Sequence, residues 1–298
     1  WFSGAQIRPV VRGMELALAL DRRTWYNLYE RNTIEKFTEL YWKENGIGGW
    51  EQHKIIPDRL YIGNAFCHLL LPGEEQLFAL MEKANVENVG ITLVFPCMRE
   101  FQVEEMVKLL KKVENWCEKR QIRVEILVND WGMAALVREN GEYLEPCLGV
   151  LLNKQKKDPR MHYKKGSTRG LGENNLQAGF YRRFLKDTYG ITRYEWESCG
   201  YPQVFPQGKN SLHLPYYQTN TSQYCPLYAS CTEGERGKQR LPESCPGYCE
   251  QYAYIYPEHL HMAGRYNSLF GLDEELVKHP EQLKAYQQAG IDRLVIGL

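Results

Sequence analysis

Four cysteines lie close together near the end of the chain, within the twenty-five residues that begin at Cys225 and end at Cys249. The two between them are Cys231 and Cys245. The intervening residues include many Gly, Pro, Lys, Arg and Glu, which favour a loop over a packed element. Thiols on such a loop are exposed and reactive unless a metal ligates them. The pattern therefore predicts a cysteine loop at 225–249 that binds a metal.

Zinc and an iron–sulfur cluster are the two metal groups that such a loop could hold. Structural zinc usually takes thiolates from close pairs of the form Cys-x2–4-Cys, and only Cys245 and Cys249 are spaced in this way. Cys225 and Cys231 form a looser pair. An iron–sulfur cluster accepts irregular spacing and can take a thiolate from a distant part of the chain. We therefore expect an iron–sulfur cluster, with zinc as the alternative.

The distant thiolate is expected just beyond a buried strand. Cys67 follows the apolar segment 59–63, and Cys97 follows the next predicted strand at 90–95. Both positions lie at the carboxyl ends of parallel strands, where α/β folds place their sites. Cys67 is the leading candidate for the fourth ligand, and Cys97 is its main rival.

Predicted strands and helices alternate along most of the chain. Short apolar segments predict the strands, and apolar residues at spacings of three and four predict the helices. This alternation is typical of a parallel sheet, and its repetition favours an α/β fold with a complete or partial (β/α) barrel. The expected strands are 59–63, 90–95, 123–128, 192–197, 211–216 and 290–296, and the main helices are 74–84, 103–116, 176–189 and 273–288.

The chain of 298 residues is expected to form one domain, 1–298, with two additions to the barrel. Residues 1–50 are expected to form an N-terminal helical extension, because the stretch 15–43 shows helical spacing of apolar residues. Residues 153–175 are rich in Lys, Arg and Gly without apolar periodicity, and are expected to form a basic surface insertion. This insertion is either a solvated loop or a contact for an anionic substrate or a partner.

The overall charge limits the classes of partner. Thirty-seven basic residues balance thirty-seven acidic ones, which argues against a broad nucleic-acid surface, although the insertion 153–175 leaves RNA open as a substrate. No run of about 18 apolar residues occurs, so no membrane span is expected. Nine cysteines without an export signal are typical of a reduced compartment, and a cytoplasmic location is expected.

Three further residues are candidates for catalysis. Asp130 follows a predicted strand and is expected either to cap the next helix or to face the same mouth as Cys67. His68 is the neighbour of Cys67 and could touch a substrate. His213 begins a polar and aromatic run before the cysteine loop that could line a pocket for an aromatic substrate, although packing is the ordinary role of such residues.

Two segments and the cysteine spacing resemble peptidase family U32. The segments are DRLYIGNAFC at 58–67 and NDWG at 129–132, and thirteen residues separate Cys231 from Cys245, with three more before Cys249. The likeness is closest to the iron–sulfur members of the family, which support oxygen-independent hydroxylation in ubiquinone synthesis. It extends from about Pro57 to the C-terminus, whereas the N-terminal stretch, the basic insertion and the additional Cys225 depart from the family pattern.

The resemblance implies a barrel that holds a 4Fe-4S cluster through Cys67, Cys231, Cys245 and Cys249. Cys225 is near enough in sequence to replace Cys231. The implied function is an oxygen-independent oxidoreductase of the hydroxylase type, acting on an unidentified small molecule for which aromatic compounds and nucleobases are candidates. One alternative is a U32-like peptidase with structural cysteines. Another is a non-catalytic metal-binding subunit of a heteromeric complex, with a paralogous protein as its partner.

Overall fold

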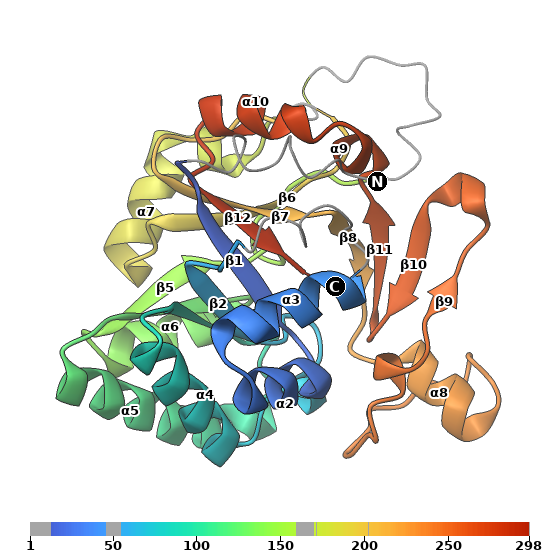
Figure 1. Cartoon of the computed structure of the whole chain (residues 1–298), viewed down its shortest axis with the longest axis horizontal. Coiled ribbons are helices and arrows are strands. Elements are labelled where there is room, and N and C mark those ends of the chain that lie inside the picture. The colour runs from blue at the N-terminus through green and yellow to red at the C-terminus, as the bar shows by residue number, and fades with distance from the viewer. Residues whose placement is uncertain (1–12, 46–54, 159–169, 171, 202, 298) are drawn as a thin grey trace.

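Eight parallel strands close into a barrel that forms the centre of the protein (Figure 1). The computed structural model describes residues 13–45, 55–158, 170, 172–201 and 203–297. Around the barrel the strands follow the order β1-β12-β7-β6-β5-β4-β3-β2, and β1 pairs with both β12 and β2 to close it. The barrel strands are β1 (Glu15–Leu20), β2 (Arg59–Gly63), β3 (Gly90–Val94), β4 (Val124–Val128), β5 (Leu144–Leu148), β6 (Arg193–Glu197), β7 (Lys209–Leu214) and β12 (Arg293–Ile296).

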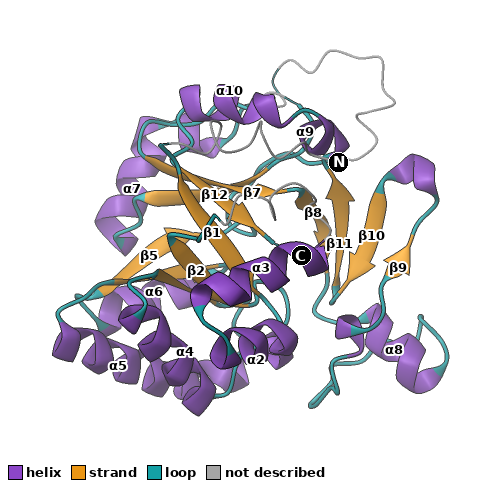
Figure 2. Cartoon of the chain, in the orientation of Figure 1, coloured by secondary structure: helices purple, strands orange, loops and turns teal. Residues whose placement is uncertain are grey.

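Helices cover the outside of the barrel (Figure 2). They are amphipathic: in α5, the buried residues Met106, Leu110, Val113 and Cys117 recur at spacings of three and four. No helix in the described part of the chain has the length and apolar character needed to cross a bilayer. The covering helices are α2 (Arg23–Arg31), α3 (Ile34–Asn45), α4 (Glu74–Val86), α5 (Val103–Arg120), α6 (Trp131–Asn140), α7 (Gly179–Tyr189), α9 (Glu274–Lys278) and α10 (Leu283–Gln288).

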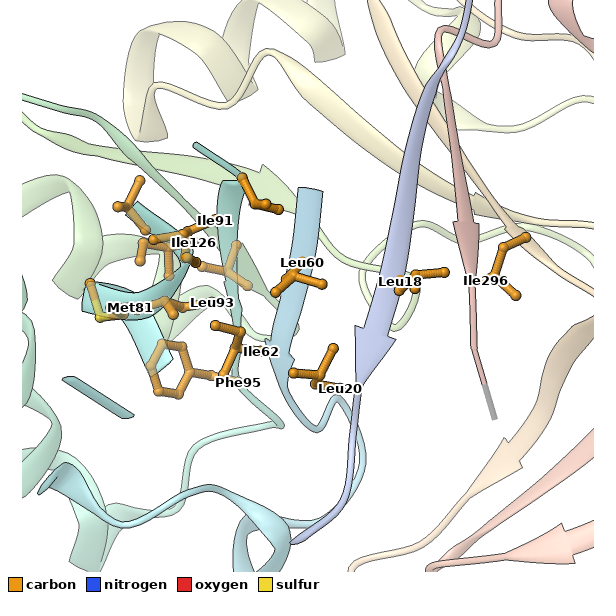
Figure 3. Close-up of a cluster of buried hydrophobic side chains, with 14 of the residues drawn as sticks. Leu18, Leu20, Leu60, Ile62, Met81, Ile91, Leu93, Phe95, Ile126 and Ile296 are labelled. Atoms are coloured by element: carbon orange, nitrogen blue, oxygen red, sulfur yellow. The ribbon is translucent and has the colours of Figure 1, made fainter. Parts of the chain in front are cut away.

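The main core lies between the barrel and its helices. Side chains alternate along a strand, so Leu16, Leu18 and Leu20 of β1 point outward into this core. Ala17, between them, belongs to a separate apolar cluster inside the barrel. Figure 3 shows Leu18 and Leu20 beside the outward residues of neighbouring strands.

Charged side chains fill the amino-terminal end of the barrel interior. Arg293 donates to Glu15 at 2.6 Å and makes two bonds to Glu125, at 2.6 and 2.9 Å. Arg59 bonds the other oxygen of Glu15 at 2.6 Å. Buried charges are costly without partners. In this network each carboxylate is paired with an arginine, and the paired side chains fill this end of the barrel. The opposite end, at the carboxyl termini of the strands, is left to form a site.

A second, antiparallel sheet is inserted between β7 and β12. It has the order β8-β11-β10-β9, and Figure 1 shows it beside the barrel rather than within it. Helix α8 (Pro226–Glu233) lies at its foot and carries part of the predicted cysteine loop. The strands are β8 (Tyr216–Thr221), β9 (Tyr254–Ile255), β10 (Met262–Arg265) and β11 (Ser268–Leu272).

The predicted α/β barrel is confirmed and is complete, but the inserted antiparallel sheet was not predicted, and three further elements differ from expectation. The N-terminal stretch is not wholly helical, because residues 15–20 alternate apolar side chains on both faces of a buried strand, β1. Strand β5 was not predicted, since Pro146 interrupts its apolar pattern. The helix expected at 273–288 is divided into α9 and α10, with a short 3-10 turn that begins at Pro280 between them.

Candidate functional site

A sharp turn after β2 directs the chain to Cys67. Gly63 has φ +125°, and a Cβ there would lie 2.1 Å from the carbonyl oxygen of Val94, so only glycine fits. Asn64 then accepts bonds from the backbone N–H groups of Phe66 and Cys67, both at 2.8 Å. Its amide group donates to the carbonyl oxygen of Asp21 at 2.8 Å. These bonds set the conformation of the backbone that carries Cys67.

Backbone N–H groups also approach the sulfurs of the cysteine loop. Cys225 is the N-cap of α8, and its Sγ accepts from the N–H of Tyr228 at 3.4 Å. The Sγ of Cys245 accepts from the N–H of Gly247, also at 3.4 Å. N–H donors of this kind stabilise negative charge on sulfur, and they surround the thiolates that ligate iron–sulfur clusters.

Helix α2 holds the two cysteine-bearing segments together. Arg23 donates from Nη2 to the carbonyl oxygens of Leu69 and Cys245, at 3.0 and 3.2 Å. Thr24 donates its backbone N–H and its hydroxyl to the carboxylate of Glu250, at 3.0 and 2.6 Å. The N-terminal region, expected to be an extension outside the barrel, therefore supplies both a barrel strand and the contacts that order the cysteine loop.

Four cysteines line one pocket between the barrel and α8: Cys67, Cys225, Cys245 and Cys249. Below, we call it the cysteine pocket. The expected set contained Cys231, with Cys225 as the alternative, but Cys231 is exposed on α8 and does not line the pocket. The reason is local: Cys225 begins α8 at the pocket, whereas Cys231 lies nearly two turns along the helix.

Cys97, the rival of Cys67, lies outside this pocket. Its thiol is exposed and donates to the carbonyl oxygen of Asn129 at 3.3 Å. All nine cysteines of the chain are free in the structure. Cys67 is thus the thiol from the barrel strands that joins the three from the inserted region.

Cys249 of the cysteine pocket is buried, whereas Cys67, Cys225 and Cys245 are partly exposed. Burial raises the pKa of the Cys67 thiol to about 11, against the opposing effect of the N–H groups of Leu69 and Leu70. Burial likewise raises the pKa of Cys249 to about 12, and nearby thiols add to the rise. A group that binds there must displace these protons, because thiolates are the ligands.

The chemistry of the cysteine pocket is that of a thiolate donor set. Its four thiols share the walls with the side chains of Leu70, Leu227 and Tyr266. Among the described residues, no group of three or more His, Cys, Asp or Glu side chains is arranged to hold a single metal ion. Four thiols are a donor set that iron–sulfur clusters and structural zinc both use, so the residues present fit either group.

A second pocket opens at the carboxyl-terminal mouth of the barrel, and we call it the mouth pocket. It lies where (β/α) barrels place their active sites. Much of its wall is apolar, with Ala19, Val94 and Leu127 at its base. Its aromatic residues are Tyr61, Phe66, Tyr216 and Phe270, and its polar side chains include Asp21, Asn64, Glu197 and His213.

His213 lines the mouth pocket as predicted, and the structure adds its partner. Its Nε2 lies 2.7 Å from Oε2 of Glu195, which is fully buried. The hydroxyl of Tyr61 bonds the same carboxylate, at 3.2 and 3.3 Å from its two oxygens. Arg293 in turn donates to the Tyr61 hydroxyl at 2.9 Å, so the chain of contacts reaches the paired charges at the closed end.

One lysine of the basic insertion lies inside the protein rather than on its surface. Lys157 is buried and pairs with the carboxylate of Glu197, a residue of the mouth pocket. The backbone N–H of Gln218 also donates to Glu197, at 2.8 Å. Residues 159–169 and 171 of the predicted insertion lie outside the described residues.

Asp130 and His68 lie outside both pockets. Asp130 caps α6 by accepting from the N–H of Met133 at 2.8 Å, and its other oxygen accepts from the N–H of Met98 at 2.7 Å. The capping alternative thus accounts for its carboxylate. His68 packs against Phe101 with ring centroids 6.2 Å apart. Burial and then the charge of Arg99 lower the pKa of His68.

An aromatic wall separates the two pockets. Phe66 stacks on Tyr266 with ring centroids 6.3 Å apart and meets Phe270 edge-on at 5.1 Å. Tyr266 lines the cysteine pocket, while its hydroxyl donates to Asp21 in the mouth pocket at 2.5 Å. Its carbonyl oxygen accepts from the thiol of Cys225 at 3.1 Å. One residue therefore contacts both sites.

Tyr266 occupies an unusual backbone position. It lies in the two-residue turn between β10 and β11 and has φ +55°, a conformation that bulky residues rarely adopt.

The sequence did not indicate that Tyr266, Asp21 or Glu195 belongs to a site, because no motif or spacing relates them to the cysteines. The one available signal was that Glu195 is a charged residue within a predicted barrel strand.

Comparisons with known proteins do not identify the chain: no family model matches it, and the search of curated proteins finds no match. The likeness to peptidase family U32 accordingly stays a prediction from its motifs.

Proposed function

We propose that the protein is a redox enzyme that holds a 4Fe-4S cluster in the cysteine pocket and transforms a small molecule in the mouth pocket. The observation that carries the proposal is the meeting of four thiols beside the mouth of a (β/α) barrel. Tyr266 and Phe66 lie between the two sites. A cluster in one pocket would therefore be separated from a ligand in the other by an aromatic layer.

The residues of the chain have distinct roles in this proposal. Cys67, Cys225, Cys245 and Cys249 would ligate the cluster, which would supply electron transfer or substrate activation. The N–H groups of Tyr228 and Gly247 support the sulfur charge. The apolar wall around these thiols limits the access of water. Ligation of reduced thiols also favours a reducing compartment such as the cytoplasm.

The mouth pocket favours a planar, largely apolar substrate. Tyr61, Phe66, Tyr216 and Phe270 provide aromatic contacts, and a few polar groups are available to orient the ligand. This composition supports an aromatic compound as the substrate class. Within redox enzymes, the likeness to the iron–sulfur members of family U32 favours oxygen-independent hydroxylation as the reaction.

Metal analysis of the anaerobically prepared protein tests this function. After cluster reconstitution, we expect visible absorption, an electron paramagnetic resonance signal on reduction, and about four irons and four sulfides per chain for one 4Fe-4S cluster. Replacing Cys225 by Ser should remove most of this iron, and Cys231→Ser on the same helix is the matched control that should retain it. A colourless, iron-free wild-type protein would refute the proposal.

The same preparation distinguishes the two alternative functions. Stoichiometric zinc together with copurification of a second chain would favour a metal-binding subunit of a complex. Hydrolysis of gelatin or small peptides that survives Cys67→Ser would favour a U32-like peptidase. Iron bound by wild type and lost in Cys67→Ser, without peptide hydrolysis, would support the redox enzyme.

A further inference from the structure

Two neighbouring barrel strands place a histidine and a carboxylate as a pair at the mouth pocket. His213 comes from β7 and Glu195 from β6, and 2.7 Å separates Nε2 from the carboxylate. A quarter of the His213 side chain is exposed, whereas none of the Glu195 side chain is. No described residue bonds the other ring nitrogen, Nδ1, so the ring has one anchored nitrogen and one available to a ligand.

The surroundings of Glu195 determine which nitrogen carries the proton. An ionised carboxylate only accepts hydrogen bonds. Burial raises the pKa of Tyr61 well above its ordinary value, with a further rise from the charge of Glu195, so the phenol keeps its proton. The Tyr61 hydroxyl oxygen accepts a hydrogen bond from Arg293. The hydrogen of this hydroxyl can therefore be donated to Glu195 or to the neighbouring Ser211. With Glu195 as a carboxylate, which only accepts, Nε2 of His213 is the donor of the bond between them.

We propose that His213 accepts a proton through Nδ1 from a ligand in the mouth pocket, and that Glu195 is the residue that positions it. A neutral imidazole with its proton on Nε2 has an unprotonated, basic Nδ1. In the step, an X–H bond of the ligand breaks, an Nδ1–H bond forms, and the electron pair stays on X, where X is oxygen, nitrogen or an acidic carbon. The resulting imidazolium charge faces the Glu195 carboxylate, which stabilises it.

The walls of the pocket narrow the class of ligand. Tyr61 meets His213 edge-on, with ring centroids 5.7 Å apart, and Phe66 and Phe270 supply further aromatic surface. A planar aromatic compound with an ionisable hydroxyl or ring N–H fits both these walls and the base. The inference rests on the proposed redox function for the reaction that the proton transfer serves, but its geometry involves no ligand of the cluster.

Nuclear magnetic resonance of protein labelled with 15N-histidine tests the tautomer. In neutral or mildly alkaline solution we expect the His213 signals of the Nε2–H form, assigned by their loss in His213→Gln. In Glu195→Gln, the amide can accept or donate, so a second tautomer should appear. His68→Gln, which removes a histidine outside both pockets, should leave the His213 signals unchanged. A wild-type His213 with its proton on Nδ1 would overturn the proposal.

Accessibility of Nδ1 is tested by diethyl pyrocarbonate, which carbethoxylates unprotonated imidazole, followed by peptide mass mapping. We expect His213 to be modified in the folded wild type. If exposed His279 reacts and His213 stays unmodified, the pair is a structural contact and the proposal is wrong. The carbethoxylation mapping uses the wild-type protein alone, so a variant that fails to fold does not prevent the decision.

The outcomes also separate this proposal from the cluster function. Cys67→Ser should lose iron while the His213 tautomer and its carbethoxylation persist. Wild type that binds iron but shows the wrong His213 tautomer would refute the acid–base role alone. An iron-free wild type with the expected His213 behaviour would refute the cluster function alone.

Discussion

The two ends of the barrel interior contain charged residues in contrasting arrangements. At the amino-terminal end, Arg293 and Arg59 bond Glu15 on the strand between them. Both arginines also pair with Glu125, which lies on β4, a strand adjacent to neither of theirs. At the mouth, His213 has one nitrogen bonded to Glu195 and one without a partner among the described residues. Barrels place stability determinants at the first end and chemistry at the second. The contrast predicts that equivalent substitutions affect stability at one end and chemistry at the other.

Removing Arg293 should give the largest loss of stability. Arg293→Met leaves the buried Glu125 and the partly buried Glu15 without the arginine that bonds both, and breaking a buried ion pair typically costs about 3–5 kcal/mol. Urea unfolding followed by circular dichroism measures the change in the free energy of unfolding. Arg123→Met is the control, because the pair of Arg123 with Glu145 is largely exposed and should be worth less than about 1 kcal/mol. Equal losses in the two variants would contradict the comparison.

Acid should weaken the closed end in a predictable pH window. Burial alone would raise the pKa of Glu125, but Arg293, by its hydrogen bonds and charge, and then Arg59 and Arg193 lower it to about 2. This folded-state pKa lies below the pKa of about 4.3 that a glutamate has in the unfolded chain. The stabilisation of the folded state by the Glu125 charge is therefore fully present above pH about 4.3. It is lost as the pH falls toward about 2, and amounts to roughly 3 kcal/mol.

Unfolding free energies measured from neutral to acidic pH test this expectation. Wild type should lose more stability on acidification than Glu125→Gln, which has no carboxylate to protonate at this position. Glu145→Gln, at an exposed position, should retain the wild-type pH dependence. Identical slopes for wild type and Glu125→Gln would show that the network does not depend on the Glu125 charge.

Tyr266, on the aromatic wall between the two pockets, provides an intermediate case. Tyr266→Phe keeps the aromatic ring but removes the hydroxyl that donates to Asp21. Because Asp21 is buried and a hydrogen bond to a charged group contributes about 1.5–3 kcal/mol, we expect a loss of about 2 kcal/mol in urea unfolding. Tyr252→Phe, at an exposed tyrosine, should have little effect. A negligible loss for Tyr266→Phe would mean that the Asp21 contact is not stabilising.

The smallest effect on stability is expected at His213. In His213→Gln the amide can still donate to Glu195, so the free energy of unfolding should change by less than about 1 kcal/mol. The carbethoxylation at this position would disappear. If His213→Gln lowered the free energy of unfolding as much as Arg293→Met, His213 would have a structural role, and the proposed difference between the two ends of the barrel would be wrong.

Local patterns in the sequence determined the fold class and predicted some of the residues that line the cysteine pocket. Buried strands such as β2 and β4, separated by amphipathic helices, predicted the parallel barrel because their periodicity is a local property. The density of cysteines predicted a binding loop for the same reason. The position of Cys67 was predictable because a residue that follows a parallel strand lies at the carboxyl-terminal end of the barrel.

Only the tertiary structure decided which groups meet. It placed Cys225, and not Cys231, at the cysteine pocket, because α8 begins there and carries its later residues away. It placed β1 in the barrel, where it pairs with β12, so that the first and last strands of the described residues lie side by side. It also brought Glu195 to His213 and Tyr266 to Asp21, which are 245 residues apart in the latter case. Contacts across such separations depend on strand register and on inserted segments, and no local periodicity records them.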